Sequence, residues 1–148
     1  MGFPVTARAR PAARATAISP RLLYAGEART DKGFGLLPDV AALLEPELSS
    51  GRARLVCQAS LNEFAGGALR TAVAALRTRP GVELIDRFLP SPEYDALFTG
   101  CDAVVLPYDP TQYRHRLSAV FVEAASAGLP VVVPDGTWMS HQLDVGLG

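Results

Sequence analysis

Short apolar segments alternate along this chain with segments in which apolar residues recur at helical spacing. The strand-like segments cover residues 21–25, 54–58, 82–86, 103–107 and 129–133. Helical patterns follow them, over residues 34–44 and 69–79, from Ser91 onward, around Glu123 and over residues 138–145. This alternation predicts an α/β fold, a Rossmann-like parallel sheet with helices on both faces and right-handed crossovers. Ligands of such sheets bind at the carboxyl ends of the strands.

The first helical pattern contains a proline. Pro38 lies among Phe34, Leu37, Val40, Ala41 and Leu44, the residues that share one face of this helix. A proline disrupts a helix interior but is well tolerated in the first turn. The pattern therefore predicts either an early kink or a helix that begins near Pro38.

Residues 117–134 form a long apolar stretch with one charge, the carboxylate of Glu123. Val120, Phe121 and Ala124 recur around it at helical spacing, and Gly128 with Pro130 is expected to end this mostly buried helix. Burying an unpaired carboxylate costs several kcal/mol. We therefore expect a partner for Glu123, which is either a pair of ligand hydroxyls, or a backbone amide or an arginine.

Composition limits the class of protein. The chain has 148 residues, 49% hydrophobic and 20% charged, with a net charge of −1. These values are typical of a soluble globular domain and argue against nucleic-acid binding by bulk electrostatics. No apolar run approaches the roughly 20 residues of a membrane span, and the N-terminus lacks the apolar core of a secretory signal. Cys57 and Cys101, placed at strands, predict reduced core thiols in a cytoplasmic protein and no metal site.

The domain organisation follows from a change in composition near residue 20. Residues 1–20 are rich in Ala, Arg and Pro without a period, which predicts an interdomain linker or flexible tail. Residues 21–148 then form the domain.

The loop after the first strand, residues 26–33, places Arg29 and Lys32 before a helix. Two cations at a helix N-terminus attract phosphate, although the same residues also fit a capping loop with solvated charges. Lys32 is the only lysine among the 14 basic residues of the chain. The loop lacks the spacing of a Walker loop and of a dinucleotide fingerprint.

The loop over residues 108–116 leads into the helix of Glu123. The first turn of that helix, Ser118, Ala119 and Val120, offers unpaired backbone N–H groups to a phosphate, and Ser118 could equally be an N-cap. His115 precedes it and fits an ordinary surface histidine as well. Two helix starts at one edge of the sheet suit a nucleoside diphosphate, with the pyrophosphate at the helix starts and the ribose diol on Glu123.

Three segments resemble the C-terminal, donor-binding domain of a GT-B retaining glycosyltransferase of family 4. Leu22-Leu-Tyr-Ala-Gly26 with Asp31-Lys-Gly33 resembles the first strand and phosphate loop of that family. Residues 82–107 resemble its base loop, helix and following strand. Phe121-Val-Glu-Ala-Ala-Ser-Ala-Gly-Leu-Pro-Val-Val133 is similar to its Leu-Glu-Ala-Met-Ala-x-Gly-x-Pro-Val-Val signature.

The resemblance implies a role for each matching residue. Glu123 would bind the donor ribose, and Lys32 the donor phosphates. The amides of Ser118, Ala119 and Val120 would reach the distal phosphate. The loop formed by Arg87, Phe88 and Leu89 would contact the base, mainly through the backbone of the loop.

Two positions depart from the family pattern. Glu27 stands where the family commonly has an arginine, and Arg29 is expected to supply that charge. His115 stands where the first acid of the Glu-x7-Glu motif would meet the donor sugar, and it could donate to a sugar hydroxyl or a phosphate instead. This substitution leaves the identity of the donor sugar open.

The resemblance also implies an enzyme in two halves. The reaction would transfer a sugar from a nucleotide diphosphate sugar to an acceptor bound by a missing N-terminal domain, without cofactor or metal. Without that domain we expect the 148 residues alone to be inactive. The family pattern continues past residue 148, so the resemblance also implies a clipped C-terminal end, and we expect self-association through exposed apolar surface. Peripheral membrane contact of a longer protein stays open. The alternatives are a GT-B-like nucleotide-sugar epimerase or phosphorylase, and a non-catalytic α/β binding module.

Overall fold

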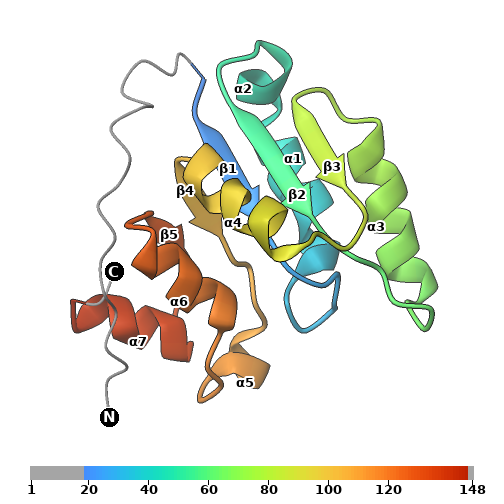
Figure 1. Ribbon diagram of the computed structural model, residues 1–148. Coiled ribbons are helices and arrows are strands. Elements are labelled where there is room, and N and C mark those ends of the chain that lie inside the picture. Colours follow the sequence, from blue (N-terminus) through green and yellow to red (C-terminus); the bar gives the residue numbers. More distant parts are fainter. Residues whose placement is uncertain (1–18, 147–148) are drawn as a thin grey trace.

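A computed structural model describes residues 19–146, and these residues form a parallel sheet between layers of helices (Figure 1). The five strands stand in the order β3-β2-β1-β4-β5, and each neighbouring pair is parallel. The strands are β1 (Arg21–Tyr24), β2 (Arg54–Gln58), β3 (Val82–Ile85), β4 (Ala103–Val105) and β5 (Val131–Val132). The α/β, Rossmann-like fold predicted from the alternating pattern is confirmed.

The helices lie between these strands in the order that the periodicity indicated. They comprise a short 3-10 helix η2 (Phe34–Leu36), α1 (Leu37–Leu43), α2 (Glu45–Ser49), α3 (Gly67–Arg77), α4 (Ser91–Gly100), α5 (Pro110–Tyr113), α6 (Ala119–Ser126) and α7 (Trp138–Asp144). Helix α4 begins at Ser91, as expected. The short helices α2 and α5 were not predicted, because each is shorter than the window over which a helical period is visible.

Two cores form on the two faces of the sheet because successive side chains of a strand point to opposite faces. In β1, Leu23 packs into the core beneath α4 and α6, whereas Tyr24 packs into the core beneath α1 and α3. In β2, Val56 joins the first core and Cys57 the second. Cys57 and Cys101 are both buried, as expected for core thiols.

The first helical pattern is divided more finely than the sequence indicated. Helix α1 begins at Leu37 with Pro38 in its first turn, so the alternative of a helix that starts near Pro38 is correct and a kink is not needed. Phe34 precedes it in the 3-10 turn and is buried.

The end of α6 agrees with the prediction, whereas the next strand does not. Gly128, at φ 70°, donates its N–H to Ala125, and Leu129 donates to Ala124, which is the hydrogen-bond pattern of a Schellman motif. The strand predicted over residues 129–133 is reduced to β5, and Val132 is 60% exposed rather than buried. The reason is that Val131 and Val133 pack against the core on one face of the sheet, so Val132 between them points to the other face, at the edge strand of the described sheet.

The predicted linker or tail over residues 1–20 lies almost wholly outside the described residues. Residues 147–148, the end of the predicted domain, lie outside them too. The strand ends carry the loops of residues 26–33, 86–90 and 106–118 to one edge of the sheet, where Figure 1 shows α5 as well.

Candidate functional site

The loop after β1 is fixed to the ends of β2 and β3 by the side chain of Gln58. This side chain is only 4% exposed. Its Oε1 accepts from the N–H of Gly26 at 2.9 Å, and its Nε2 donates to the carbonyl of Arg87 at 3.1 Å. One buried amide therefore joins the two loops that were predicted to bind phosphate and base.

The same loop is also fixed to the end of β4. Gly33 has a φ of 69°, and a Cβ there would lie 1.8 Å from the carbonyl oxygen of Pro107. Next to it, the N–H of Asp109 donates to the carbonyl of Asp31 at 2.9 Å. Only a residue without a side chain lets the two backbones approach this closely.

Lys32 lies between this loop and the start of α6. An ideal Cβ on Gly26 would lie 3.7 Å from both the Lys32 Nζ and the Val120 Cγ2, so Lys32 and the first turn of α6 flank the same glycine. The Nζ is 6.0 Å from the ring centroid of Tyr108. Within residues 19–146 no hydrogen bond or ion pair engages this ammonium. Burial, followed by the charge of Arg29, lowers the pKa of Lys32.

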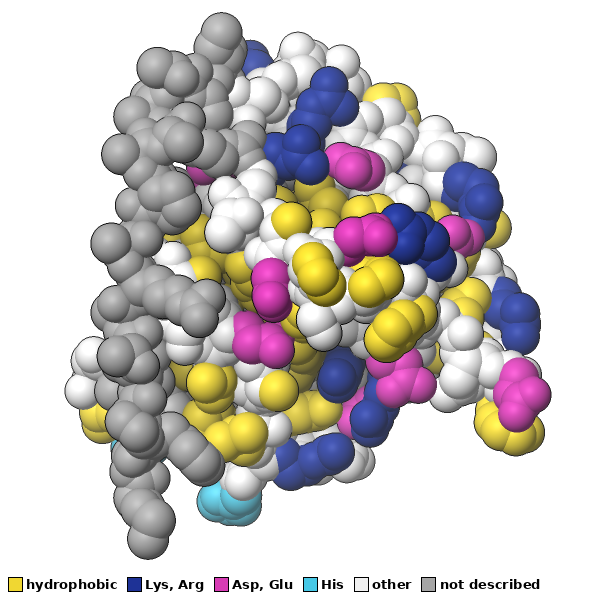
Figure 2. Space-filling view, in the orientation of Figure 1, with side chains coloured by type: hydrophobic (Ala, Val, Ile, Leu, Met, Phe, Trp, Pro, Cys, Tyr) yellow, Lys and Arg dark blue, Asp and Glu magenta, His cyan; other side chains and the backbone are white. Residues whose placement is uncertain are grey.

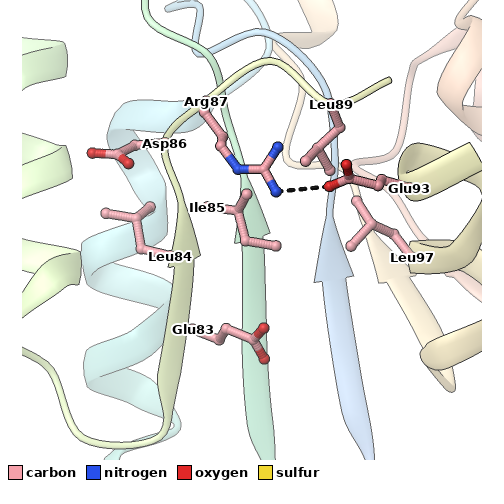
Figure 3. Close-up of a pocket in the computed structure, with 8 residues that line it drawn as sticks. All are labelled: Glu83, Leu84, Ile85, Asp86, Arg87, Leu89, Glu93 and Leu97. Carbon is pink, nitrogen blue, oxygen red and sulfur yellow. Dashed lines mark hydrogen bonds and ion pairs between the residues drawn. The ribbon is translucent and has the colours of Figure 1, made fainter. Parts of the chain in front are cut away.

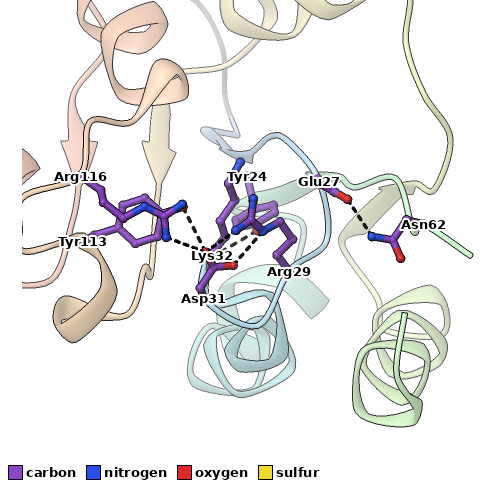
Figure 4. A network of polar contacts seen from close by, with 8 residues as sticks. All are labelled: Tyr24, Glu27, Arg29, Asp31, Lys32, Asn62, Tyr113 and Arg116. Carbon is purple, nitrogen blue, oxygen red and sulfur yellow. Dashed lines mark hydrogen bonds and ion pairs between the residues drawn. The ribbon is translucent and has the colours of Figure 1, made fainter. Parts of the chain in front are cut away.

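Asp31 is the centre of a polar network that joins the two loops (Figure 4). Arg29 donates to it through Nε at 2.9 Å and through Nη2 at 2.6 Å. Arg116 and the hydroxyl of Tyr113 reach the Asp31 Oδ2 at 3.3 and 3.4 Å. Burial by itself would raise the pKa of Asp31, but the hydrogen bonds and charge of Arg29, with the charge of Arg116, outweigh it and lower this pKa.

Asp31→Asn is expected to reduce the free energy of unfolding by about 1 kcal/mol at neutral pH, because it weakens the bonds to both arginines. The folded-state pKa of Asp31 lies below its ordinary value of 3.8. Its stabilisation is therefore complete above pH 3.8 and is lost as the pH falls through the folded-state value. Urea denaturation of both proteins at several pH values measures this difference. A gap that persists unchanged in acid, below the folded-state pKa, would contradict it.

The start of α6 has the local geometry expected of a helix N-terminus. The Ser118 Oγ accepts from the N–H of Phe121 at 3.1 Å, so this serine is the N-cap, one of the two roles considered. Ala119 and Val120 are the first two residues of the helix, whose N–H groups have no partner inside a helix. His115 is exposed on the preceding loop.

Glu123 differs from its predicted environment. Its side chain is exposed, because the buried face of α6 carries Val120, Phe121 and Ala124 instead. Its partner is the hydroxyl of Tyr94, which donates to the Glu123 Oε2 at 2.9 Å, and neither a backbone amide nor an arginine. Burial, followed by the charge of Glu123, raises the pKa of Tyr94. The carboxylate thus lies at the surface with capacity for further donors.

A cavity of about 300 Å³ lies between the first loop and the loop after β3. It is lined by Gly26, Glu27, Gln58, Ser60, Phe88, Leu89 and Tyr94. Phe88 is 79% exposed and Leu89 only 6%. Of the loop predicted to contact a base, Phe88 offers a ring at the cavity and Leu89 contributes to its wall.

Arg87 points into a different hollow, of about 390 Å³, between β3 and α4 (Figure 3). There its Nη2 donates to the Glu93 Oε2 at 2.7 Å, and Ile85 and Leu97 line the same space. Only the backbone of Arg87 is joined to the first cavity, through Gln58. The side chains of residues 87–89 therefore do not act as one surface.

Basic and acidic side chains lie side by side at this edge of the molecule. Figure 2 shows dark blue and magenta side chains in contact on the lower part of the visible face. Among residues 19–146, no three His, Cys, Asp or Glu side chains are grouped so that they could hold a metal ion. No helix in this part of the chain combines the length and apolarity needed to cross a bilayer.

Several residues that shape the site were not predicted from the sequence. No pattern in the sequence singles out Tyr94 or Tyr113 as a site residue, whereas Arg116 is one of the charged residues in the loop over residues 108–116. Gln58 carried one usable signal, since it is a polar residue at the carboxyl end of an otherwise apolar strand. The remaining contacts join two loops, and the spacing of residues along the sequence does not show which loops are in contact.

Neither protein-family models nor curated proteins match this chain. Solved structures do, and their fold is the Rossmann-like type found in GT-B glycosyltransferases. Several of them are trehalose-6-phosphate synthases. The E. coli protein bound with UDP-2-fluoro glucose has a TM-score of 0.66 at 14% identity, over 88% of this chain and 32% of that chain. The UDP-forming synthase from Burkholderia xenovorans in complex with glucose-6-phosphate has a TM-score of 0.66 at 13% identity. The match covers 88% of this chain and 32% of that chain.

A further trehalose-6-phosphate synthase structure, described for glycosyltransfer with retention and bisubstrate glycomimetics, has a TM-score of 0.64 at 13% identity. It covers 94% of this chain and 36% of that chain. The chain thus spans about a third of the length of these proteins. The TM-scores establish the shared fold, and identities this low establish nothing beyond it.

Proposed function

We propose that this chain is the donor-binding domain of a retaining glycosyltransferase and that its site takes a nucleotide diphosphate sugar. The observation that carries the proposal is the position of Lys32. Its half-buried ammonium lies beside Gly26 and the first turn of α6, and no carboxylate among the described residues forms a hydrogen bond or ion pair with it. Leaving a buried cation unpaired is costly, so an anionic ligand is the natural partner.

The proposed donor extends along the edge of the sheet in both directions from Lys32. The diphosphate lies against Lys32, Arg29 and the N–H groups of Ala119 and Val120. The base enters the cavity of about 300 Å³ beside Phe88 and Leu89. The ribose diol donates to Glu123, whose Oε2 is already oriented by Tyr94 at 2.9 Å. A solved structure of the same fold holds UDP-2-fluoro glucose, which supports a donor of this chemical class.

In this proposal the domain stabilises the leaving group. As the sugar departs, negative charge builds on the diphosphate, and fixed cations with helix N–H groups offset it. Lys32 and Arg29 supply the positive charge. Because the Arg29 guanidinium has five N–H donors and uses only part of them on Asp31, donors remain for phosphate oxygens.

His115 has the least support among the proposed site residues. It is exposed on the loop that leads into α6, where it could reach a sugar hydroxyl or a phosphate oxygen. We also propose that the acceptor binds to another domain, so that the 148 residues alone do not transfer sugar. Transfer of sugar from a nucleotide diphosphate sugar to an added acceptor by the 148 residues alone would contradict this last point.

Calorimetric titration with UDP, GDP and ADP tests the function. We expect one diphosphate to bind more tightly than the other two, and Glu123→Ala to weaken that binding by about tenfold through lost bonds to the ribose. The matched control is Glu63→Ala, because Glu63 is exposed in the loop after β2 and makes no side-chain hydrogen bond or ion pair within the described residues. Equal binding of all three compounds and of inorganic phosphate would contradict a nucleotide site.

A further inference from the structure

Arg116, one of the charged residues in the loop before α6, is held in place more firmly than a surface arginine usually is. Its Nη1 is 3.3 Å from the Asp31 Oδ2, and its guanidinium carbon lies 4.7 Å from the ring centroid of Tyr113. Tyr113 is itself 2% exposed and donates to the same carboxylate. Salt bridge and stacking together restrict the guanidinium to one orientation, while half of its side chain stays exposed.

The surrounding charges are unbalanced. Lys32, Arg29 and Arg116 lie near two carboxylates, those of Asp31 and Glu27, so the cluster keeps one net positive charge (Figure 4). Arg29 and Arg116 both act on Lys32 by disfavouring its charged form, which shows that the three cations share one region. Such a cluster of fixed cations is stabilised when a polyanion enters it.

We propose that Arg116 is a third cationic ligand of the diphosphate, with Asp31 and Tyr113 as its positioning residues. The inference rests on the proposed function and adds to it a side chain from the loop after β4. The donor phosphates would then be held from two loops at once, by Lys32 and Arg29 of residues 26–33 and by Arg116 of residues 106–118. The carboxylate of Asp31 keeps both guanidinium groups oriented toward that space.

Inorganic pyrophosphate is the probe that tests this proposal, because it carries the diphosphate without base or sugar. We expect Arg116→Gln to weaken pyrophosphate binding about tenfold, the loss of one charge-assisted contact. Arg114→Gln is the matched control, since Arg114 lies on the same loop, is exposed and makes no side-chain hydrogen bond or ion pair within residues 19–146. It should change the affinity less than twofold. Both variants should retain the urea midpoint of the parent closely enough to be fully folded during titration.

Three outcomes would overturn the assignment: no pyrophosphate binding by the parent protein, equal losses in both variants, or an unchanged affinity in Arg116→Gln. Titration with the preferred nucleoside diphosphate separates this failure from that of the proposed function. If the nucleotide affinity falls in Lys32→Ala but is unchanged in Arg116→Gln, only the role of Arg116 is rejected. Arg116-dependent pyrophosphate binding without preference for any nucleotide would support the anion site and reject the nucleotide function.

Discussion

Gly33→Ala is expected to lower the free energy of unfolding by about 3 kcal/mol or more, among the largest effects of a single substitution. The backbone of Gly33 has a φ of 69°, which by itself costs an alanine about 1–2 kcal/mol. Its Cβ would also meet the Pro107 carbonyl oxygen at 1.8 Å, so one of the two backbones must move. Urea denaturation followed by circular dichroism measures the loss.

Gly35→Ala is the control for this prediction. Gly35 lies two residues further in the same 3-10 turn, and a Cβ there meets nothing within 4 Å. Its stability should change by less than about 1 kcal/mol, the range of intrinsic propensity. Equal losses in the two variants would show that the contact between Gly33 and Pro107 is not what holds the loop. Because Asp31 and Lys32 directly precede Gly33, ligand affinity should fall together with stability.

Lys32→Ala is expected to weaken binding of the preferred nucleoside diphosphate by about tenfold to a hundredfold, through loss of a half-buried, charge-assisted contact. Arg52→Ala is its control. Arg52 lies before β2, at the opposite edge of the sheet, and its side chain is 67% exposed. Calorimetry of both variants against the same nucleotide measures the difference. A loss of less than twofold in Lys32→Ala would remove this residue from the site.

The pH dependence of binding provides an independent check on Lys32. Burial lowers its pKa below the ordinary value of 10.5, so the free protein loses this charge at a lower pH than an exposed lysine does. The affinity for a diphosphate should therefore fall as the pH rises, and the fall should begin below pH 10.5. In Lys32→Arg the guanidinium stays charged, and the affinity should remain flat over that range.

The fold could be predicted from the sequence because strands and helices each leave a characteristic spacing of apolar residues. Strands such as β2, with Leu55, Val56 and Cys57 all buried, must lie inside a parallel sheet covered on both faces. The edge strand β5 was overestimated for the same reason. Its valines look like those of a central strand, and only the three-dimensional order of strands shows that Val132 faces outward.

The site was harder to predict from the sequence because it depends on contacts between loops that are distant in the chain. Arg29 and Lys32 were found through their position before a helix. The pairing of Asp31 with Tyr113 and Arg116 requires contact between two loops, because these residues lie 82 and 85 positions from Asp31 in the sequence. Glu123 was expected to be buried because its neighbours in sequence are apolar, but a helix has two faces and Glu123 lies on the exposed one.

The most direct test of the central claim is an NMR titration of the isotope-labelled chain with the preferred nucleoside diphosphate, following backbone amide shifts. The donor-site account predicts the largest changes at Gly26–Gly33, at Ala119 and Val120, and at Phe88 and Leu89, with little change in α2 or at Gly81 on the opposite edge of the sheet. A nucleotide that shifts other amides, or none of these, would contradict the account.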